Sequence, residues 1–346
     1  MNSAWQQWLQ SAGAKIEDGR VGSFGDAKAE LEAAGAGDVL ADLSHLGALE
    51  FTGDDSEAFL QAQLTCDVHA IEPNSSSLGS YCTPKGRMLA SFLLWRIEGG
   101  FRMALSRGIV PAVHKRLKMY VLRSKVQIAE VSDRVVLLGV SGAGAARALA
   151  PVSAGLPQRT REVASLAGGG SLIAVPEARF VLSIPVEAAA GIWTALASML
   201  RPVGTPCWEW LDIRAGVPLI TEKTQEQFLP QMANLELIGG VSFKKGCFPG
   251  QEVVARTQHL GRVKRRMFLA RLDDAGEVVP APGDDIFSDD IPGQASGMVV
   301  NAQPAPEGGY ELLAVLQLSS RDGSAVHVGS AGGPVLRFLD LPYPVS

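Results

Sequence analysis

Short apolar runs of strand length recur along this chain and alternate with turn residues and short helical segments. The run VVLLGV at 135–140 precedes a glycine turn and the helix-type segment AARAL, as LEFT precedes GDDSEAFLQAQL at 53–64. After Met267, short strands alternate with Gly, Pro and Asp turns, which is typical of a small antiparallel barrel. The pattern predicts an α+β fold with two related α+β halves, interleaved or consecutive, and a C-terminal antiparallel β-barrel.

The length of 346 residues suggests two or three domains, at roughly 100–200 residues each. We place an N-terminal α+β half at 1–130 and a second α+β half at 131–262. The C-terminal barrel is placed at 263–346. The first 35 or so residues are polar and Ala/Gly-rich, and they predict a short helix with a variable lead-in.

Composition and charge exclude several classes of protein. The net charge of −5 disfavours direct nucleic-acid binding and binding to anionic membranes. The opening residues MNSAWQQWLQ lack the features of a secretory signal, and no apolar run approaches the ~20 residues that span a bilayer. The four cysteines are far apart, so neither a disulfide framework nor a metal site built from this chain alone is expected. We therefore expect a reduced, cytoplasmic protein without a membrane partner.

The segment most suited to a chemical role is SFKKGCFPGQEVVAR at 242–256. It places the Cys247 thiol in a glycine-flanked loop before a predicted helix that QEVVAR opens. Gly246 and Gly250 permit backbone conformations closed to other residues. The helix N-terminus and the adjacent lysines Lys244 and Lys245 would favour a thiolate. A plain structural loop with a buried cysteine fits these residues equally well.

Two other segments bear on this loop. SYCTPKGRMLASFLLWR at 80–96 predicts a hairpin that turns at Pro84–Gly86. The stretch Thr221–Gly240, just before the cysteine, has no regular pattern, and long irregular stretches inside compact proteins are often functional.

The cysteine segment resembles the signature of the YgfZ family, which groups with the glycine-cleavage T-protein (GcvT) in one folate-binding superfamily. The family pattern is K-G-C, an aromatic residue, any residue, then G-Q-E. This chain meets it with Lys245, Gly246, Cys247, Phe248, Pro249, Gly250, Gln251 and Glu252. Further similarity at DLSHLGALEFTG, YCTPKGRMLASF, LDIRAGVPLI and FLPQMANLELIGG extends the resemblance over about 42–266.

The resemblance implies a ring-like arrangement of domains around a tetrahydrofolate site. It also implies a role in assembling or repairing iron–sulfur proteins, including a tRNA-modifying enzyme. Cys247 would be the functional residue. The cofactor-binding residues would be Lys245, Gly246, Phe248, Gly250, Gln251 and Glu252.

Two departures argue against T-protein chemistry. The T-protein carries an acidic pair after the glycine of the hairpin, where this chain has Ala90 and Ser91. The missing carboxylate would manage protons at the folate nitrogens. Arg214 stands where relatives often carry Glu, so a folate contact assigned to that carboxylate is in doubt here.

Weaker signals have plain structural explanations. The acidic tail of folate needs cations, and solvated surface charges fit the same residues: Arg107, Arg116, Arg123 and Lys125. Trp208 and Trp210 fit core packing better than a ring pocket. Gly139, Gly142 and Gly144 follow the order GxxGxG and predict a strand-to-helix turn rather than a dinucleotide loop.

Our leading hypothesis is a tetrahydrofolate-binding accessory protein whose partners are iron–sulfur client proteins and whose reactive group is Cys247. Whether it is an enzyme stays open. The enzyme alternative is a folate-dependent one-carbon transferase, similar to an aminomethyltransferase. The third and least favoured hypothesis is direct tRNA contact through the basic cluster Arg262–Arg266.

Overall fold

The computed structural model describes residues 1–259, 261 and 263–345, and the chain divides into two compact units. The first unit comprises Met1–Glu57, His69–Ser77 and Leu93–Leu211. The second comprises Ala58–Val68, Leu78–Phe92 and Asp212–Ser346. Each unit is thus assembled from segments that are separate in sequence. The three predicted domains, with boundaries after residues 130 and 262, stay a prediction, and so does their ring-like arrangement.

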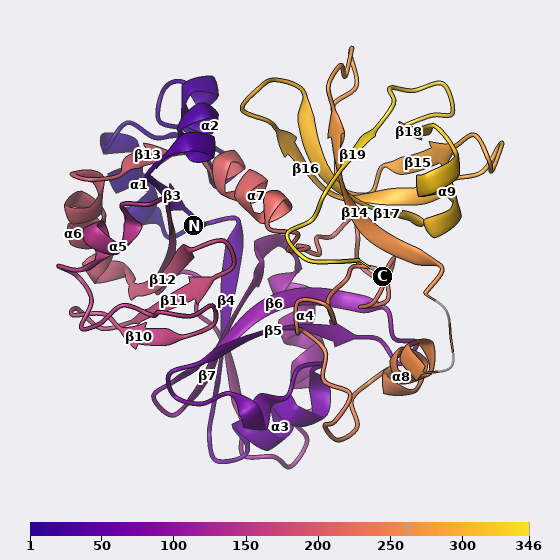
Figure 1. The fold of residues 1–346 in the computed structure, drawn as a ribbon. Helices are drawn as coiled ribbons and strands as arrows, with labels where there is room; N and C mark the ends of the chain where they lie inside the picture. Colours follow the sequence, from indigo (N-terminus) through magenta and orange to yellow (C-terminus); the bar gives the residue numbers. More distant parts are fainter. Residues whose placement is uncertain (260, 262, 346) are drawn as a thin grey trace. The chain divides into compact units, whose positions relative to one another are not determined.

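The first unit contains most of the helices (Figure 1). Its helices are α1 (Ser3–Ser11), α2 (Ala27–Ala36), η2 (Arg107–Ile109), α4 (Val110–Lys118), α5 (Ala145–Leu149) and α6 (Val186–Ala197). Its strands are β1 (Lys15–Glu17), β2 (Arg20–Ser23), β3 (Val39–Asp42), β4 (Leu46–Thr52), β7 (Gly100–Ser106), β8 (Gln127–Glu130), β9 (Val135–Ser141), β10 (Val163–Ser165), β11 (Ser171–Val175), β12 (Arg179–Pro185) and β13 (Arg201–Val203). The boundary between the units passes through α3 (Ser56–Gln63), η1 (Val68–Ala70), β5 (Ser76–Cys82), β6 (Met88–Ile97) and α7 (Thr205–Arg214).

In the described part of the chain, a six-stranded sheet of the first unit has the order β10-β11-β12-β9-β3-β13. Neighbouring strands are antiparallel except β3 and β13, which are parallel. Strands β3 and β4 follow each other closely in sequence, but they belong to different sheets, since β4 pairs with β7 and β8. The order of that second sheet is β5-β6-β7-β4-β8.

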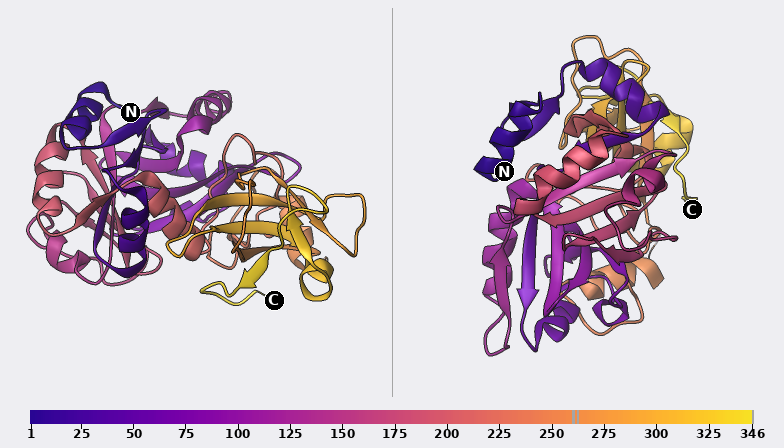
Figure 2. Two further views of the ribbon diagram at one scale, coloured as in Figure 1. Left: turned by 90° about the horizontal axis from the view of Figure 1, so that it is seen from above. Right: turned by 90° about the vertical axis from the view of Figure 1, so that its left-hand side faces the viewer.

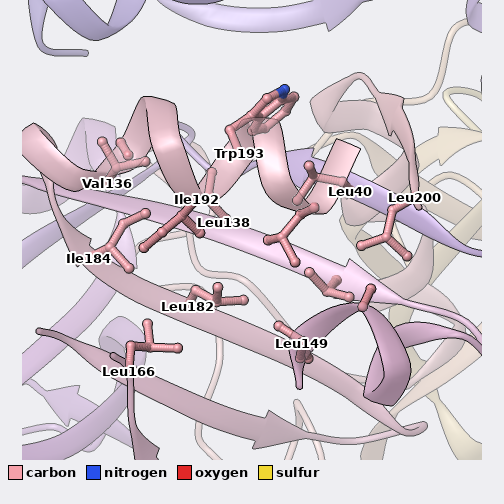
Figure 3. Packing of buried hydrophobic residues seen from close by; sticks show 14 of the residues in the cluster. Leu40, Val136, Leu138, Leu149, Leu166, Leu182, Ile184, Ile192, Trp193 and Leu200 are labelled. Carbon is pink, nitrogen blue, oxygen red and sulfur yellow. The ribbon is translucent and has the colours of Figure 1, made fainter. Parts of the chain in front are cut away.

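The main core of the first unit lies where the six-stranded sheet meets helices α1, α5 and α6. Leu138 and Leu182 come from the sheet, and Ile192 and Trp193 from helix α6 (Figure 3). Trp5 of helix α1 stacks on Trp8 and donates a hydrogen bond of 2.7 Å from Nε1 to the buried carboxylate of Asp42. The short helix predicted in the N-terminal segment is thus present as α1, and it contributes to the core.

The second unit carries the C-terminal sheet, drawn in orange and yellow in Figures 1 and 2. Its elements are α8 (Gln251–His259), β14 (Arg265–Leu272), β15 (Asp285–Ser288), β16 (Gly297–Pro304), β17 (Tyr310–Gln317), α9 (Leu318–Gly323), β18 (Val326–Val328) and β19 (Arg337–Leu339). The strand order among described residues is β18-β15-β16-β17-β14-β19, and the pairs are antiparallel. The α+β class and the antiparallel C-terminal β structure are thus confirmed.

Strand β14 is buried on both faces, because its side chains alternate between two cores. Met267 and Leu269 join one core, whereas Phe268 and Leu272 join the other. The first core also holds Phe248 of the cysteine motif. The C-terminal sheet therefore provides the surface on which the cysteine motif is built.

The irregular stretch 221–240 is held by side chains that bond to backbone groups of its neighbours. The buried Gln231 donates to the carbonyl of Val254 at 2.7 Å, and the buried Asn234 donates to the carbonyl of Met267 at 2.7 Å. Neither helix nor strand forms between α7 and α8, as expected, yet the backbone is tied to α8 and to β14. Its observed role is to position these two elements.

Candidate functional site

Cys247 lies in an exposed position in the loop that precedes helix α8. The other three cysteines are buried, and none of the four is in a disulfide. Burial raises the pKa of Cys82 to about 12, and it does the same to the pKa of Cys207. Because a thiolate is the reactive form, these two buried thiols are inert at neutral pH, and Cys247 is the cysteine that reagents can reach.

Helix α8 begins at Gln251, which confirms the predicted helix start after the cysteine. The amide of Gln251 donates to the carbonyl of Phe248 at 3.1 Å, and the amide of Val254 donates to the carbonyl of Gly250 at 3.1 Å. The loop thus turns directly into the helix. Glu252 lies in the first helical turn, where a carboxylate is favoured by the helix dipole.

Lys245 is directed toward the end of helix α3. Its Nζ donates to the carbonyls of Gln61 at 2.6 Å, Leu64 at 2.6 Å and Cys66 at 2.8 Å. Burial lowers the pKa of Lys245 to about 8, an effect opposed by the nearby side chains of Cys66 and Asp67. The charge expected from Lys245 beside the thiol is therefore bound to backbone oxygens of another segment, whereas Lys244 is exposed.

The two glycines of the loop, Gly246 and Gly250, differ in whether their positions would accept a side chain. Gly250 has φ +82°, and a Cβ there would lie 2.5 Å from the Cα of Gly86. Gly86, with φ +74°, forms the turn of the predicted hairpin, which is confirmed by the bond from its amide to the carbonyl of Thr83 at 2.8 Å. At Gly246 a Cβ would meet no atom within 4 Å among the described residues. The need for glycine is thus clear at 250 and not at 246.

Phe248 is a core residue. Its ring is only 6% exposed and packs in a cluster with Cys82, Met88 and Val254. The motif residues that were predicted to contact the cofactor therefore differ in solvent exposure. Lys245 and Phe248 face inward, whereas Glu252 is exposed. All six assignments stay predictions.

Residues that depart from the T-protein pattern are engaged in structural contacts. Ala90 is fully buried. The hydroxyl of Ser91 donates to the carbonyl of Pro218 at 2.8 Å and accepts from the amide of Ile220 at 2.9 Å. Arg214 lies 3.6 Å from Glu311. No carboxylate stands at either hairpin position.

The other candidates from the sequence lie mostly in the first unit. Arg107 pairs with Asp133 at 3.2 Å, and Lys125 pairs with Asp54 at 3.5 Å. Trp208 and Trp210 are core residues, as expected. Gly142 and Gly144 form the expected turn between β9 and α5, whereas Gly139 lies within β9, and the amide of Gly144 donates to Asp38.

The basic cluster near residue 264 is only partly available. Arg262 lies outside the described residues. Arg266 is buried, pairs with Glu236 and donates to the carbonyl of Gln231 at 2.9 Å. This pairing removes one of the cations on which direct tRNA contact would depend.

The first unit contains an open cavity of about 650 Å³, which is lined by charged and hydroxyl side chains and by apolar residues such as Ile97 and Val163. Its volume is within the range of small-molecule pockets. Two arginines in its wall are already engaged, since Arg102 bonds to Glu50 and Ser183, and Arg96 bonds to Glu57. These two arginines are therefore not free to bind an acidic ligand.

The described ranges contain neither a grouped set of metal-ligating side chains nor a helix that could cross a membrane. Within them, no three His, Cys, Asp or Glu side chains are grouped so that they could hold a metal ion. The helices formed by these residues are too short or too polar to cross a bilayer.

The contacts of the motif were not foreseen from the sequence. The anchoring partners of Lys245 are backbone carbonyls, which carry no residue signature. Gln231 and Asn234 did leave a signal, because they are polar residues three apart in the mostly apolar run FLPQMANLEL.

Comparisons with known proteins agree with the fold and with the family resemblance. Residues 6–245 match the family model of the GCVT N-terminal domain. The tRNA-modifying protein YgfZ of Klebsiella pneumoniae is 34% identical over 296 residues, which cover 84% of this chain and 89% of that protein. The YgfZ protein of Edwardsiella ictaluri is also 34% identical, over 85% of this chain and 89% of its own length.

A solved structure shows the same fold at low identity. The glycine cleavage system aminomethyltransferase T from Bartonella henselae superposes with a TM-score of 0.77 at 17% identity, over 98% of this chain and 96% of that one. The likeness at that identity concerns the fold alone. On the domain match and the two relatives, the chain belongs to the YgfZ family, among the proteins that share the GCVT N-terminal domain.

Proposed function

We propose that this chain binds tetrahydrofolate or a derivative and serves as an accessory protein in the assembly or repair of iron–sulfur proteins, with Cys247 as its reactive thiol. The observation that carries the proposal is the contrast among the cysteines. Cys247 is exposed in the motif loop before α8, whereas Cys66, Cys82 and Cys207 are buried. An exposed thiol is suited to reaction or to metal ligation, because reagents and partners can reach it.

Folate binding is supported by the domain family and by the shared fold. Gly246, Gln251 and Glu252 surround Cys247 in sequence and are at least partly accessible, so they are the motif residues proposed to contact the cofactor directly. Lys245, Phe248 and Gly250 would contribute by shaping the loop. When bound, the folate would supply or accept a one-carbon unit.

The clients are proposed from the relatives and from the chemistry of the thiol. Curated relatives are named as tRNA-modifying proteins, so a tRNA-modifying iron–sulfur enzyme is the first client to test. One thiolate supplies one ligand to a passing cluster. Because the described residues offer no grouped metal ligands, the client would supply the remaining ligands.

Two measurements test the proposal. Calorimetry with tetrahydrofolate should show saturable binding to the full chain. In a deletion strain, wild-type protein and the exposed neighbour variant Lys244→Ala should restore iron–sulfur enzyme activity, whereas Cys247→Ala should not. Absence of folate binding, or full rescue by Cys247→Ala, would overturn the proposal.

The one-carbon transferase is the less favoured function. Ala90 and Ser91 occupy the positions of the acidic pair, and the Ser91 hydroxyl is committed to backbone groups. The chain thus lacks, at these positions, a carboxylate for proton transfer. Formation of methylene-folate from an amine donor by the purified protein would restore this alternative.

A further inference from the structure

We infer that Lys245 is a positioning residue, which fixes the Cys247 loop to the end of helix α3 as one of three anchors. The thiol loop is defined here as residues 245–250. This inference rests on the proposed function of Cys247 for its significance, since the anchored loop presents the thiol to which that function is assigned. Its evidence, however, is the geometry of the loop.

The first anchor is the ammonium of Lys245. An ammonium has three N–H donors, and the carbonyls of Gln61, Leu64 and Cys66 can accept all three. These oxygens lie at and just beyond the end of α3, where carbonyls lack helical partners and a positive charge is favourable. Lys245 therefore caps a helix that is 184 residues away in sequence at Gln61.

The segment that enters the loop is tied to the same place. The hydroxyl of Thr65 donates to the carbonyl of Gly240 at 2.7 Å. The carbonyl of Thr65 accepts from the amide of Ser242 at 2.9 Å. Residues 61–66 thus hold both the approach to the loop and its first side chain.

The second and third anchors lie on the other side of the cysteine. Phe248 inserts its ring into the core that strand β14 shares. Gly250 packs on Gly86 of the hairpin turn, closer than a side chain would permit. Between these anchors only Gly246 and Cys247 are exposed within 245–248, so the spacing of the motif holds the backbone on both sides of the thiol.

This arrangement separates two possible roles for the lysine. A lysine that activates a thiol electrostatically must direct its charge at the sulfur. The Lys245 donors are instead taken up by backbone oxygens, so its removal should loosen the loop without changing the acidity of the thiol. Arginine should not replace it, because a planar guanidinium cannot converge three donors from one nitrogen.

The test measures the motion of Cys247 itself. A nitroxide label is attached to the exposed Cys247 of the full chain, and its electron paramagnetic resonance spectrum is recorded for wild type, Lys245→Met, Lys245→Arg and the exposed control Lys244→Met. We expect a shift of spectral weight to the mobile component in both Lys245 variants and a wild-type spectrum for Lys244→Met. Unchanged spectra in the Lys245 variants would overturn the inference.

A second readout is the pH profile of Cys247 alkylation by iodoacetamide. The midpoint for Lys245→Met should match that of wild type. A midpoint moved to higher pH would show that the ammonium stabilises the thiolate, and positioning would be the wrong role. Should Lys245→Met fail to fold in a thermal melt, Lys245→Arg and Gly250→Ala, which loosens the third anchor, decide the question by the same spectra.

The outcomes keep the two proposals apart. Label mobility and alkylation require neither folate nor a client. Full rescue of the deletion strain by Cys247→Ala would remove the proposed function and leave the anchor intact, whereas an unmoved label would remove the anchor and leave the thiol role intact.

Discussion

The Cα of Gly86 occupies the space where a side chain at Gly250 would begin, 2.5 Å from the ideal Cβ position. Two glycines from segments far apart in sequence therefore touch backbone to backbone beside the motif cysteine. Both have positive φ, so each also holds a conformation that other residues rarely adopt. This contact makes glycine at 250 a requirement of packing as well as of backbone geometry.

We expect Gly250→Ala to lower the free energy of unfolding by about 2 kcal/mol, because the left-handed conformation and the overlap with Gly86 both penalise a Cβ. Urea denaturation monitored by circular dichroism measures the change. Gly246→Ala is the matched control, since its Cβ would meet nothing within 4 Å, and it should stay within about 0.5 kcal/mol of wild type. Equal stabilities for the two variants would contradict the close contact between Gly250 and Gly86.

The four thiols should differ in their rate of modification, because only one of these four side chains is exposed to solvent. In native protein, Ellman's reagent should modify Cys247 rapidly and the buried Cys66, Cys82 and Cys207 only after denaturation. Cys247→Ser should abolish the rapid phase and leave the total in denaturant smaller by one thiol. A rapid phase that persists in Cys247→Ser would show that another cysteine is accessible.

Removing one partner of the buried ion pair between Arg266 and Glu236 should strongly lower the stability of the protein. Their side chains are 7% and 6% exposed, so Glu236→Gln would leave the Arg266 charge buried and unpaired at a cost of roughly 3 kcal/mol. Asp54→Asn provides the comparison, since it breaks the exposed pair with Lys125 and should change stability by less than about 0.5 kcal/mol. Chemical denaturation measures the loss of unfolding free energy in each variant. Nearly equal losses would contradict the expected difference between the buried pair and the exposed pair.

His45 should make the fold sensitive to mild acid. Burial, with a smaller effect from Arg20, holds the pKa of His45 well below 6.5, and neither ring nitrogen has a hydrogen-bond partner among the described residues. The unfolded chain therefore binds the proton more readily, and stability is present above pH 6.5 and lost as pH falls below it, by up to about 1.4 kcal/mol per unit from this group.

Thermal melts between pH 7.5 and 5 check this dependence. His45→Phe removes the titrating ring and should show a smaller loss of melting temperature over that interval than wild type. His69→Gln, which alters an exposed histidine, should keep the wild-type slope. If His45→Phe and wild type lose the same number of degrees, another group causes the acid sensitivity.

Local patterns were sufficient to predict much of the fold. The hairpin turn at Gly86, the helix that starts at Gln251 and the antiparallel C-terminal strands follow from turn residues and periodicity within short windows. The short N-terminal helix was predicted, but its place in the core was not, because Trp5 packs and bonds with partners such as Asp42 that lie in other elements. A polar average over 35 residues conceals one such contact.

The site was less predictable for a related reason. The family motif identifies Lys245 and Phe248 but does not distinguish a ligand contact from an anchor. The distinction depends on carbonyls at 61–66 and on apolar side chains from β6 and β14, which come together only in the folded chain. Gly250 was predicted to need unusual backbone freedom. Its close contact with Gly86 could not be predicted, because it forms only in the folded chain.

The double burial of β14 limits how this protein can be altered. Deleting Met267, for example, would transfer every following side chain to the opposite side of the sheet, so that Phe268 would enter the layer beneath the cysteine motif, where Met267 and Leu269 now pack. Both layers would then be filled with side chains of the wrong shape at once. Insertions and deletions in this strand should therefore abolish folding, whereas lengthening the turn around Glu307 and Gly308 between β16 and β17 should be tolerated.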